Sequence, residues 1–203
     1  MERNLKIKPA AILFDMDGVL VDSLDAWWES LNTALKNFNK EEISRGEFIE
    51  KFWGHDLFNN LKKLRLNENI GIFCNNIYIN HVNVIKIFPN TIDTLKKLKY
   101  YKKAVITNTP KDCALQILKK FEIEKYFNII ITSDEVENGK PAPDIVFKAC
   151  NNLRVKPSEA VLIGDTESDM KAGRAAGCKV IGIKVDGDFS INTISELTNI
   201  IDS

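Results

Sequence analysis

The sequence predicts an α/β fold: a Rossmann-like parallel sheet flanked by helices, with an α-helical subdomain inserted after the first strand. Two observations predict it. From residue 102 onward, short runs of β-branched residues alternate with segments of helical spacing, which is typical of parallel strands that are buried on both faces. Between the first apolar run and this region, the apolar residues follow helical spacing only.

The expected strands are short apolar runs. The first is the run at residues 10–14, and four more follow at 104–106, 129–131, 161–163 and 180–183. Each of these four precedes a segment in which apolar residues recur with helical spacing. Those segments lie at 113–121, 145–150, 170–176 and 194–200. The alternation predicts a five-stranded parallel sheet covered by helices.

The inserted segment is expected to be a helical cap over residues 22–86, which leaves residues 1–21 and 87–203 as the α/β core. Apolar spacing indicates its helices near residues 24–38, 48–53, 57–64 and 70–85. The last of them is less regular, because its many Ile, Val and Asn residues are poor helix formers.

Composition points to local recognition of a small ligand. The chain has 203 residues, and its 28 Lys and Arg residues balance its 28 Asp and Glu residues. This balance provides no general field for binding nucleic acid or an anionic membrane. The N-terminal residues are broken by charges, and no apolar run has the length of a signal-peptide core or a membrane span. We therefore expect a cytoplasmic enzyme, whose oligomeric state the sequence leaves open.

Zinc and redox chemistry are not indicated by the cysteines and histidines. No Cys-x-x-Cys pair occurs, and the two histidines do not match the spacing of zinc ligands. Cys113, Cys150 and Cys178 lie among apolar neighbours, where a free cysteine usually acts as a small buried hydrophobic residue.

Two acids directly follow the first expected strand. Asp15 and Asp17 are one residue apart, and Gly18 allows the chain to turn so that both can face one small volume. Like charges this close need a partner, and Mg²⁺ is commonly held by one or two carboxylates together with the phosphate oxygens of a substrate. The leading hypothesis is Mg²⁺-dependent phosphoryl transfer. An EF-hand is excluded because Gly falls at the fourth position from Asp15 and Val19 at the fifth. An ordinary Asp-Gly turn remains the structural alternative.

Further polar residues follow the other expected strands. Because open parallel sheets bind ligands at the carboxyl ends of their strands, these residues should reach the same crevice as Asp15. They are Thr107 and Asn108, Lys140 in a Pro-rich loop, and Asp165 and Asp169. Four acids, one lysine, one hydroxyl and one amide together suit a metal ion and a phosphate dianion.

These residues, in this order, resemble the four motifs of the haloacid dehalogenase-like hydrolase superfamily. The motif residues are Asp15 to Ser23, Thr107 with Asn108, Lys140, and Gly164 and Asp165 with Asp169. The insertion after the first motif is similar to the helical cap of that superfamily. The nearest subgroup is that of the phosphoglycolate phosphatase and β-phosphoglucomutase-like proteins. The resemblance covers essentially the whole chain and implies a phosphoric monoester hydrolase.

The resemblance also implies roles for the two neighbouring acids and the residues that bind phosphate. Asp15 would be the nucleophile, which forms an aspartyl-phosphate and so divides one difficult displacement into two. Asp17 would be the general acid for the leaving alcohol and then the base for water. Thr107 and Asn108 would donate hydrogen bonds to the phosphoryl oxygens, and Lys140 would offset the charge of Asp15 and phosphate. As a structural alternative, Lys140 would be an ordinary solvated lysine in a turn.

The metal site implied by the resemblance consists of an oxygen of Asp15, the backbone carbonyl of Asp17 and the carboxylate of Asp165. Asp169 would support the metal or Lys140 from behind. As an acid in the first turn of a helix, Asp169 would also be stabilised by the helix dipole whatever the function.

Substrate choice is expected to lie in the cap. Gly54 and His55 fall between two expected cap helices, where related caps present a specificity loop to the site. His55 is therefore a candidate substrate contact, with an idle loop histidine as the alternative. Trp27, Trp28 and Trp53 fit helical periodicity and are expected in the hydrophobic core of the cap.

Two other functions stay open. A sugar-phosphate mutase of the β-phosphoglucomutase type would use the same motifs, but such proteins tend to carry a histidine where this chain has Trp27. A non-enzymatic phospho-acceptor or phosphate-binding protein would resemble a response-regulator receiver. A receiver, however, is a single compact domain without a cap, and its phosphorylated Asp follows the third strand.

Overall fold

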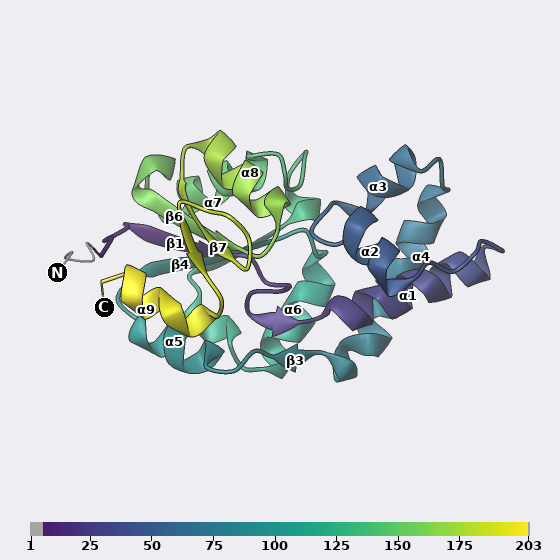
Figure 1. Cartoon of the computed structure of the whole chain (residues 1–203), viewed down its shortest axis with the longest axis horizontal. Helices are drawn as coiled ribbons and strands as arrows, with labels where there is room; N and C mark the ends of the chain where they lie inside the picture. Colours follow the sequence, from purple (N-terminus) through teal and green to yellow (C-terminus); the bar gives the residue numbers. More distant parts are fainter. Residues whose placement is uncertain (1–5, 203) are drawn as a thin grey trace.

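The computed structural model describes residues 6–202. A six-stranded sheet lies at its centre, in the order β5-β4-β1-β6-β7-β8, with all neighbouring strands parallel. Helices cover both faces of this sheet, and a separate group of helices lies at one end of the molecule (Figure 1). The predicted α/β Rossmann-like class is confirmed. The strands are β1 Ala11–Phe14, β4 Lys102–Thr107, β5 Ile129–Thr132, β6 Ala160–Gly164, β7 Lys179–Ile183 and β8 Phe189–Ile191.

Strand β1 shows why both faces of the sheet need helices. Side chains alternate between faces along a strand, so Ile12 and Phe14 point to one side and Ala11 and Leu13 to the other. All four are fully buried. The first face packs against α5 Thr91–Lys97, α6 Lys111–Lys120 and α9 Leu197–Ile200, and the second against α7 Asp144–Leu153 and α8 Glu167–Ala176.

The last strand, β8, was not expected from the sequence. Its three residues include the exposed Ser190, so the apolar run is too short and interrupted to be recognised as a buried strand. The strand forms because Ile181 of β7 and its neighbours offer a free parallel edge to Phe189 and the residues after it. The five strands that were expected all occur, each one to three residues longer or shorter than its apolar run.

The helices between residues 24 and 84, called the cap below, form a hydrophobic core of their own. Leu31, Leu35, Phe48 and Leu61 lie at its centre and are almost completely buried. The expected helix over 70–85 divides into an α-helix and a 3₁₀ segment, in keeping with its β-branched and Asn residues. The cap elements are α1 Leu24–Asn37, α2 Arg45–Lys51, α3 Leu57–Lys63, α4 Glu68–Tyr78 and η1 Ile79–Val84.

Two short strands connect the cap to the sheet. Strand β2, Val21–Asp22, enters the cap and pairs antiparallel with β3, Lys86–Ile87, which leaves it. In addition, the Lys120 ammonium group of α6 donates hydrogen bonds to the carbonyl oxygens of Val82, Asn83 and Ile85 at 2.6, 3.2 and 3.1 Å. The cap is therefore tied to the rest of the protein where it begins and ends. Its domain boundaries at residues 22 and 86 stay a prediction.

Short 3₁₀ helices complete the connections. They are η2 Glu124–Tyr126, η3 Ser133–Glu135, η4 Pro157–Glu159 and η5 Ile194–Glu196. Within residues 6–202, no helix combines the length and the apolar character that a membrane crossing requires.

The fully buried Leu162 in β6 tests the importance of the sheet core. Leu162→Ala should lower the free energy of unfolding by about 2–5 kcal/mol, because it removes methyl groups and leaves a cavity. The matched control is Leu64→Ala, whose side chain is 44% exposed, and which should cost less than about 0.5 kcal/mol. Urea denaturation measures both. Equal losses in the two variants would contradict the packing described here.

Candidate active site

The polar residues of the site gather where three central strands end. Strand β1 lies between β4 and β6, with Phe14 opposite Val105 on one side and Ile163 on the other. The backbone N–H of Asp15 still donates to the carbonyl oxygen of Ile163, at 2.9 Å. Residues that follow these strands must therefore lie side by side at the carboxyl edge of the sheet, as the sequence predicted.

A buried lysine connects two of the acids. The Lys140 Nζ lies 2.7 Å from Asp15 Oδ1 and 2.6 Å from Asp169 Oδ1, and it donates a third hydrogen bond to the carbonyl oxygen of Ile106 at 3.3 Å. Lys140 is 2% exposed, Asp15 5% and Asp169 0%. All three hydrogens of the ammonium group are engaged. The Lys140 ammonium group is therefore a fixed positive charge at the base of the site. Lys140 is not the solvated turn lysine of the structural alternative.

Asp17 is held by hydroxyl groups. Ser23 donates to its Oδ1, while Thr109 and Thr107 donate to its Oδ2, at 2.7 and 3.2 Å for the two threonines. The Thr107 hydroxyl also accepts a hydrogen bond from the backbone of Thr109, at 3.0 Å. The orientation of the Asp17 carboxylate is thus set by three donors from two segments of the chain.

Asp165 faces both the turn after β1 and the cap. A Cβ added to Gly18, whose φ is +79°, would lie 2.0 Å from Asp165 Oδ2, so only glycine fits this close approach. The indole N–H of Trp53, in the cap, donates to the same Oδ2 at 3.1 Å. The other oxygen, Oδ1, is buried and has no hydrogen-bond partner among residues 6–202.

A metal ion would meet suitable ligands here. One carboxylate oxygen from each of Asp15, Asp165 and Asp169 lies within 4.8 Å of the others. Both oxygens of Asp169 already have partners, because Oδ1 binds Lys140 and Oδ2 accepts from the hydroxyl of Thr166 at 2.6 Å. Asp15 and the unpartnered Oδ1 of Asp165 are the oxygens that remain, and hard divalent cations prefer such ligands.

The pKa shifts of the acids show that a further positive charge would be favourable at this site. Burial, together with the neighbouring carboxylates, raises the pKa of Asp15 well above its ordinary range, although Lys140 opposes the shift. Burial and Asp169 raise the pKa of Asp165 to about 7, against the hydrogen bond from Trp53. Burial alone would lower the pKa of Lys140, but the carboxylates of Asp15 and Asp169 raise it above its usual value. The lysine alone does not neutralise these acids.

The other predicted site residues lie around the same pocket. The Asn108 amide is paired with the backbone of Lys140, donating to its carbonyl oxygen and accepting from its N–H, both at 2.9 Å. One Nδ2 hydrogen of Asn108 remains for a ligand. Thr107 is occupied by Asp17, as described above. Gly54 and His55 line the pocket from the cap side. Phosphate binding by Thr107 and Asn108, and substrate contact by His55, stay predictions.

Three residues at the site were not assigned by the sequence. Ser23 and Thr109 hold Asp17; Ser23 ends the first motif and Thr109 directly follows the second, so the hydroxyl groups themselves were the available signal. Trp53 was expected in the core of the cap. It does pack there, but its N–H also reaches Asp165 across 112 positions of sequence. No spacing rule connects residues so far apart.

Fold and site together define an α/β protein with an acid-lined site at the strand ends, covered by a helical cap. The sequence model of the haloacid dehalogenase-like hydrolases matches residues 12–183, and the chain belongs to this family. The resemblance seen in the four motifs is thereby confirmed.

Curated relatives match over nearly the whole chain. The pyrophosphatase PpaX of Halalkalibacterium halodurans is 27% identical over 206 residues, which cover 94% of this chain and 95% of the relative. PpaX of Bacillus pumilus is 29% identical, with the same coverage of both chains.

Solved structures share the fold. A predicted phosphoglycolate phosphatase from Haemophilus somnus has a TM-score of 0.81 at 24% identity, covering 96% of this chain and 98% of its own. A mutant of CbbY from Rhodobacter sphaeroides, in complex with xylulose-1,5-bisphosphate, has a TM-score of 0.84 at 21% identity, covering 95% and 99%.

Binding of Mg²⁺ should depend on pH through Asp165. Below its pKa of about 7 this carboxyl carries a proton in the metal-free protein, so the metal must displace that proton. The apparent affinity should therefore fall as the pH is lowered from about 8 to about 6, by at most about tenfold per unit for one proton. Titration calorimetry measures it. Asp165→Asn should remove the binding, and an affinity that is equal at both pH values would contradict the proposed site.

Proposed function

We propose that this protein is a Mg²⁺-dependent phosphatase that hydrolyses a small phosphorylated metabolite through an aspartyl-phosphate on Asp15. The observation that carries the proposal is the position of the Asp15 carboxylate at the end of β1, with Lys140 on one side and Asp165 on the other. Membership in the hydrolase family supports it, as do the relatives that are named as phosphatases.

The metal would be held by Asp15 and Asp165, with the backbone carbonyl of Asp17 as a predicted third ligand. When bound, it would neutralise these acids and the phosphate and would polarise the phosphoryl group. Lys140 holds Asp15 in place and offsets its charge. Because its three hydrogens are engaged, Lys140 acts mainly through its fixed charge and less through a new hydrogen bond to phosphate.

In the first step, an Asp15 oxygen attacks phosphorus and the bond from phosphorus to the leaving oxygen breaks. Asp17 gives its proton to that oxygen, and the alcohol departs. In the second step, water attacks phosphorus and gives a proton to Asp17, and inorganic phosphate leaves with Asp15 restored. The hydroxyls of Ser23 and Thr109 suit both steps, because a hydroxyl can donate to a carboxylate or turn to accept from a carboxylic acid.

The other candidate functions receive less support. The position at which sugar-phosphate mutases tend to carry a histidine holds Trp27, whose ring stacks on Tyr78 at 3.7 Å. A non-enzymatic phospho-acceptor does not need an oriented acid such as Asp17. The predicted cap over residues 22–86 would close over the site during phosphoryl transfer and exclude water.

Replacement of the nucleophile tests the proposal directly. Asp15→Asn should reduce hydrolysis of phosphate monoesters by on the order of 10³-fold or more, since an amide is a poor nucleophile of nearly the same size. Wild-type protein should lose activity in excess EDTA and regain it with Mg²⁺. The matched control is Asp93→Asn, an exposed acid on α5 outside the motifs, which should retain activity. Circular dichroism checks that the fold survives, and an active Asp15→Asn variant would refute the mechanism.

Asp17→Asn should separate the two steps. With p-nitrophenyl phosphate, whose leaving group needs no proton, Asp15 should still be phosphorylated while its dephosphorylation slows. Rapid-mixing kinetics should show a burst of about one nitrophenol per site followed by a slow phase. Steady-state rates like those of the wild type would mean that Asp17 has another role.

A further inference from the structure

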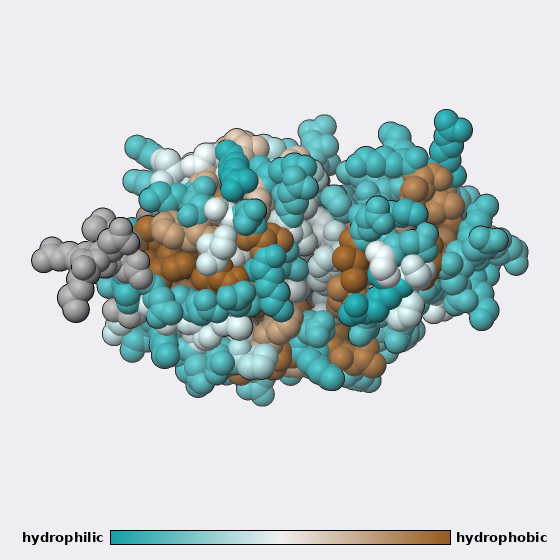
Figure 2. Space-filling model, in the orientation of Figure 1, coloured by the Kyte–Doolittle hydropathy of each residue, from teal (hydrophilic) through white to brown (hydrophobic). Residues whose placement is uncertain are grey.

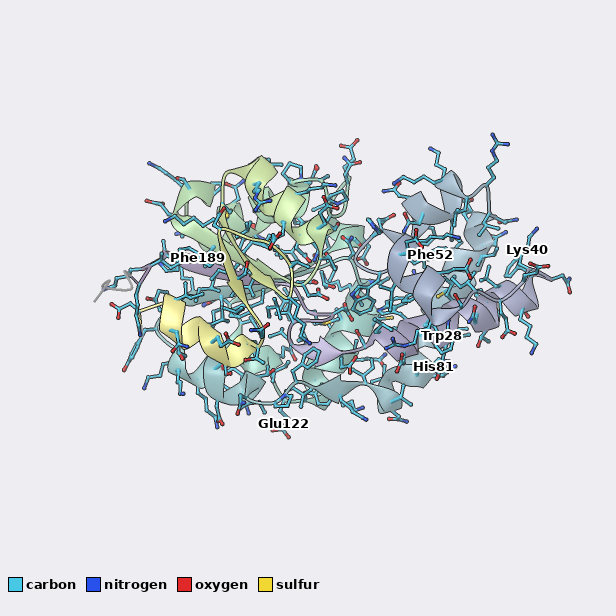
Figure 3. The ribbon with its side chains drawn as sticks, in the orientation of Figure 1. Trp28, Lys40, Phe52, His81, Glu122 and Phe189 are labelled. Carbon is cyan, nitrogen blue, oxygen red and sulfur yellow. The ribbon has the colours of Figure 1, made fainter. Side chains whose placement is uncertain are left out.

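The pocket above Asp15 has two different sides. It comprises about 720 Å³ of space not filled by atoms, a volume that includes open solvent at its mouth. The polar side is formed by the strand ends. The cap side is mainly aromatic, and its aromatic residues are Trp27, Phe48, Phe52, Trp53 and Phe58. Figure 2 shows hydrophobic side chains gathered on the cap where it faces the sheet. Phe52 follows directly on α2, in the cap (Figure 3).

Several of these aromatic walls are held in place. Trp53 donates its N–H to Asp165 and packs against Phe48, with ring centroids 6.3 Å apart. The Trp27 ring stacks on Tyr78 with an angle of 13° between the planes. A ligand ring entering the pocket would therefore meet aromatic surfaces whose orientation is already set, and offset or edge-to-face contacts between rings are favourable.

The cap side offers no free cation. Among the pocket-lining residues, all of which belong to the described part of the chain, Lys140 is the single Lys or Arg. Its ammonium group is already used by Asp15, Asp169 and the Ile106 carbonyl. His55 is the other lining residue that could become positive, but partial burial and the nearby Lys63 and Lys171 lower its pKa. Asp56 adds a carboxylate to the same side.

This distribution of charge disfavours an anionic leaving group. A carboxylate, as in phosphoglycolate, or a second phosphate, as in pyrophosphate or a bisphosphate, would place another negative charge against aromatic rings. A charge removed from water in this way is costly unless a counter-charge and hydrogen bonds compensate for it. An uncharged ring avoids that cost and gains contact area with the cap.

One buried acceptor on the cap side has no hydrogen-bond donor among the described residues. Asn75, on α4, lines the pocket, and its Oδ1 is buried without a hydrogen-bond partner within residues 6–202. A buried acceptor without a donor is unfavourable. A leaving group that carries an N–H or O–H within reach of Asn75 would satisfy it.

We propose that the substrate is a phosphate monoester whose leaving group is an uncharged alcohol that carries a planar heteroaromatic ring with a hydrogen-bond donor, the chemistry of a nucleoside 5′-monophosphate. The proposal rests on the proposed phosphatase function and specifies its substrate class. Phosphate lies at Asp15, the ring lies against the aromatic walls of the cap, and its donor reaches Asn75. Hydrolysis with one water gives the nucleoside and inorganic phosphate.

The test compares kcat/KM for five compounds with Mg²⁺: adenosine 5′-monophosphate, phenyl phosphate, glycerol 3-phosphate, phosphoglycolate and pyrophosphate. The first two should exceed the last three by about tenfold or more. A higher kcat/KM for adenosine 5′-monophosphate than for phenyl phosphate indicates a nucleotide substrate. The reverse order indicates an ester of a smaller aromatic alcohol. Equal or better turnover of the anionic compounds, or of glycerol 3-phosphate, would overturn the inference while leaving the phosphatase function intact.

Variants test the two sides separately. Phe58→Arg supplies the missing cation at a side chain that is 39% exposed, and should shift the ratio of kcat/KM toward phosphoglycolate by about tenfold. The matched control is Ile72→Arg, at an exposed position outside the pocket, which should leave the ratio unchanged. Asn75→Leu should lower kcat/KM more for adenosine 5′-monophosphate than for phenyl phosphate. An unchanged ratio in Phe58→Arg would contradict the inference that the lack of a free cation on the cap side disfavours anionic leaving groups.

A measurement without turnover separates the two proposals. Adenosine should change the tryptophan fluorescence of the wild-type protein at lower concentration than glycolate does, since Trp27 and Trp53 both line the pocket. If none of the esters is hydrolysed, the proposed function fails. The binding comparison then still decides whether the pocket prefers an aromatic or an anionic ligand.

Discussion

The site depends on the burial of one ammonium group between two carboxylates. Lys140, Asp15 and Asp169 are each at most 5% exposed, and removal of one partner from such a set typically costs about 3–5 kcal/mol because a buried charge loses its compensation. This interaction fixes the Asp15 carboxylate at the end of β1 and connects three segments that are far apart in sequence. Asn108 reinforces it by binding the backbone of Lys140 on both sides of the residue.

The arrangement leaves the acids incompletely neutralised, and this is useful for phosphoryl transfer. Two carboxylates and one ammonium group engage each other, while Asp165 keeps a buried oxygen without a partner among the described residues. A protein that only needed a stable strand end would replace such a group with an apolar one. Retaining it makes chemical sense where a cation and a phosphate enter together.

Residues of the cap line the pocket and also lie over it. Gly54, with φ +73°, approaches Thr166 so closely that an added Cβ would lie 2.4 Å from the threonine Cγ2. Its neighbour Trp53 reaches Asp165. The cap loop is therefore in direct contact with the segment that follows β6, and the aromatic side of the pocket meets the acidic side there. Trp53 therefore belongs to the aromatic side of the pocket and also orients Asp165, a candidate metal ligand.

The sequence by itself determined the class of fold and the positions of the motif residues. Buried parallel strands appear as apolar runs such as 161–163, and the rule that ligands lie at strand ends then places Asp15, Thr107 and Asp165 together. Both inferences need only local patterns and a general topology.

Only the tertiary structure decided how these residues are used. Strand β8 depends on a free sheet edge, the Asn108 amide is occupied by the Lys140 backbone, and Trp53 bonds to Asp165. Such contacts join segments whose separation follows no periodicity, and several polar partners compete for each group. Which partner wins depends on the distances between atoms in the packed chain, and residue types alone do not specify those distances.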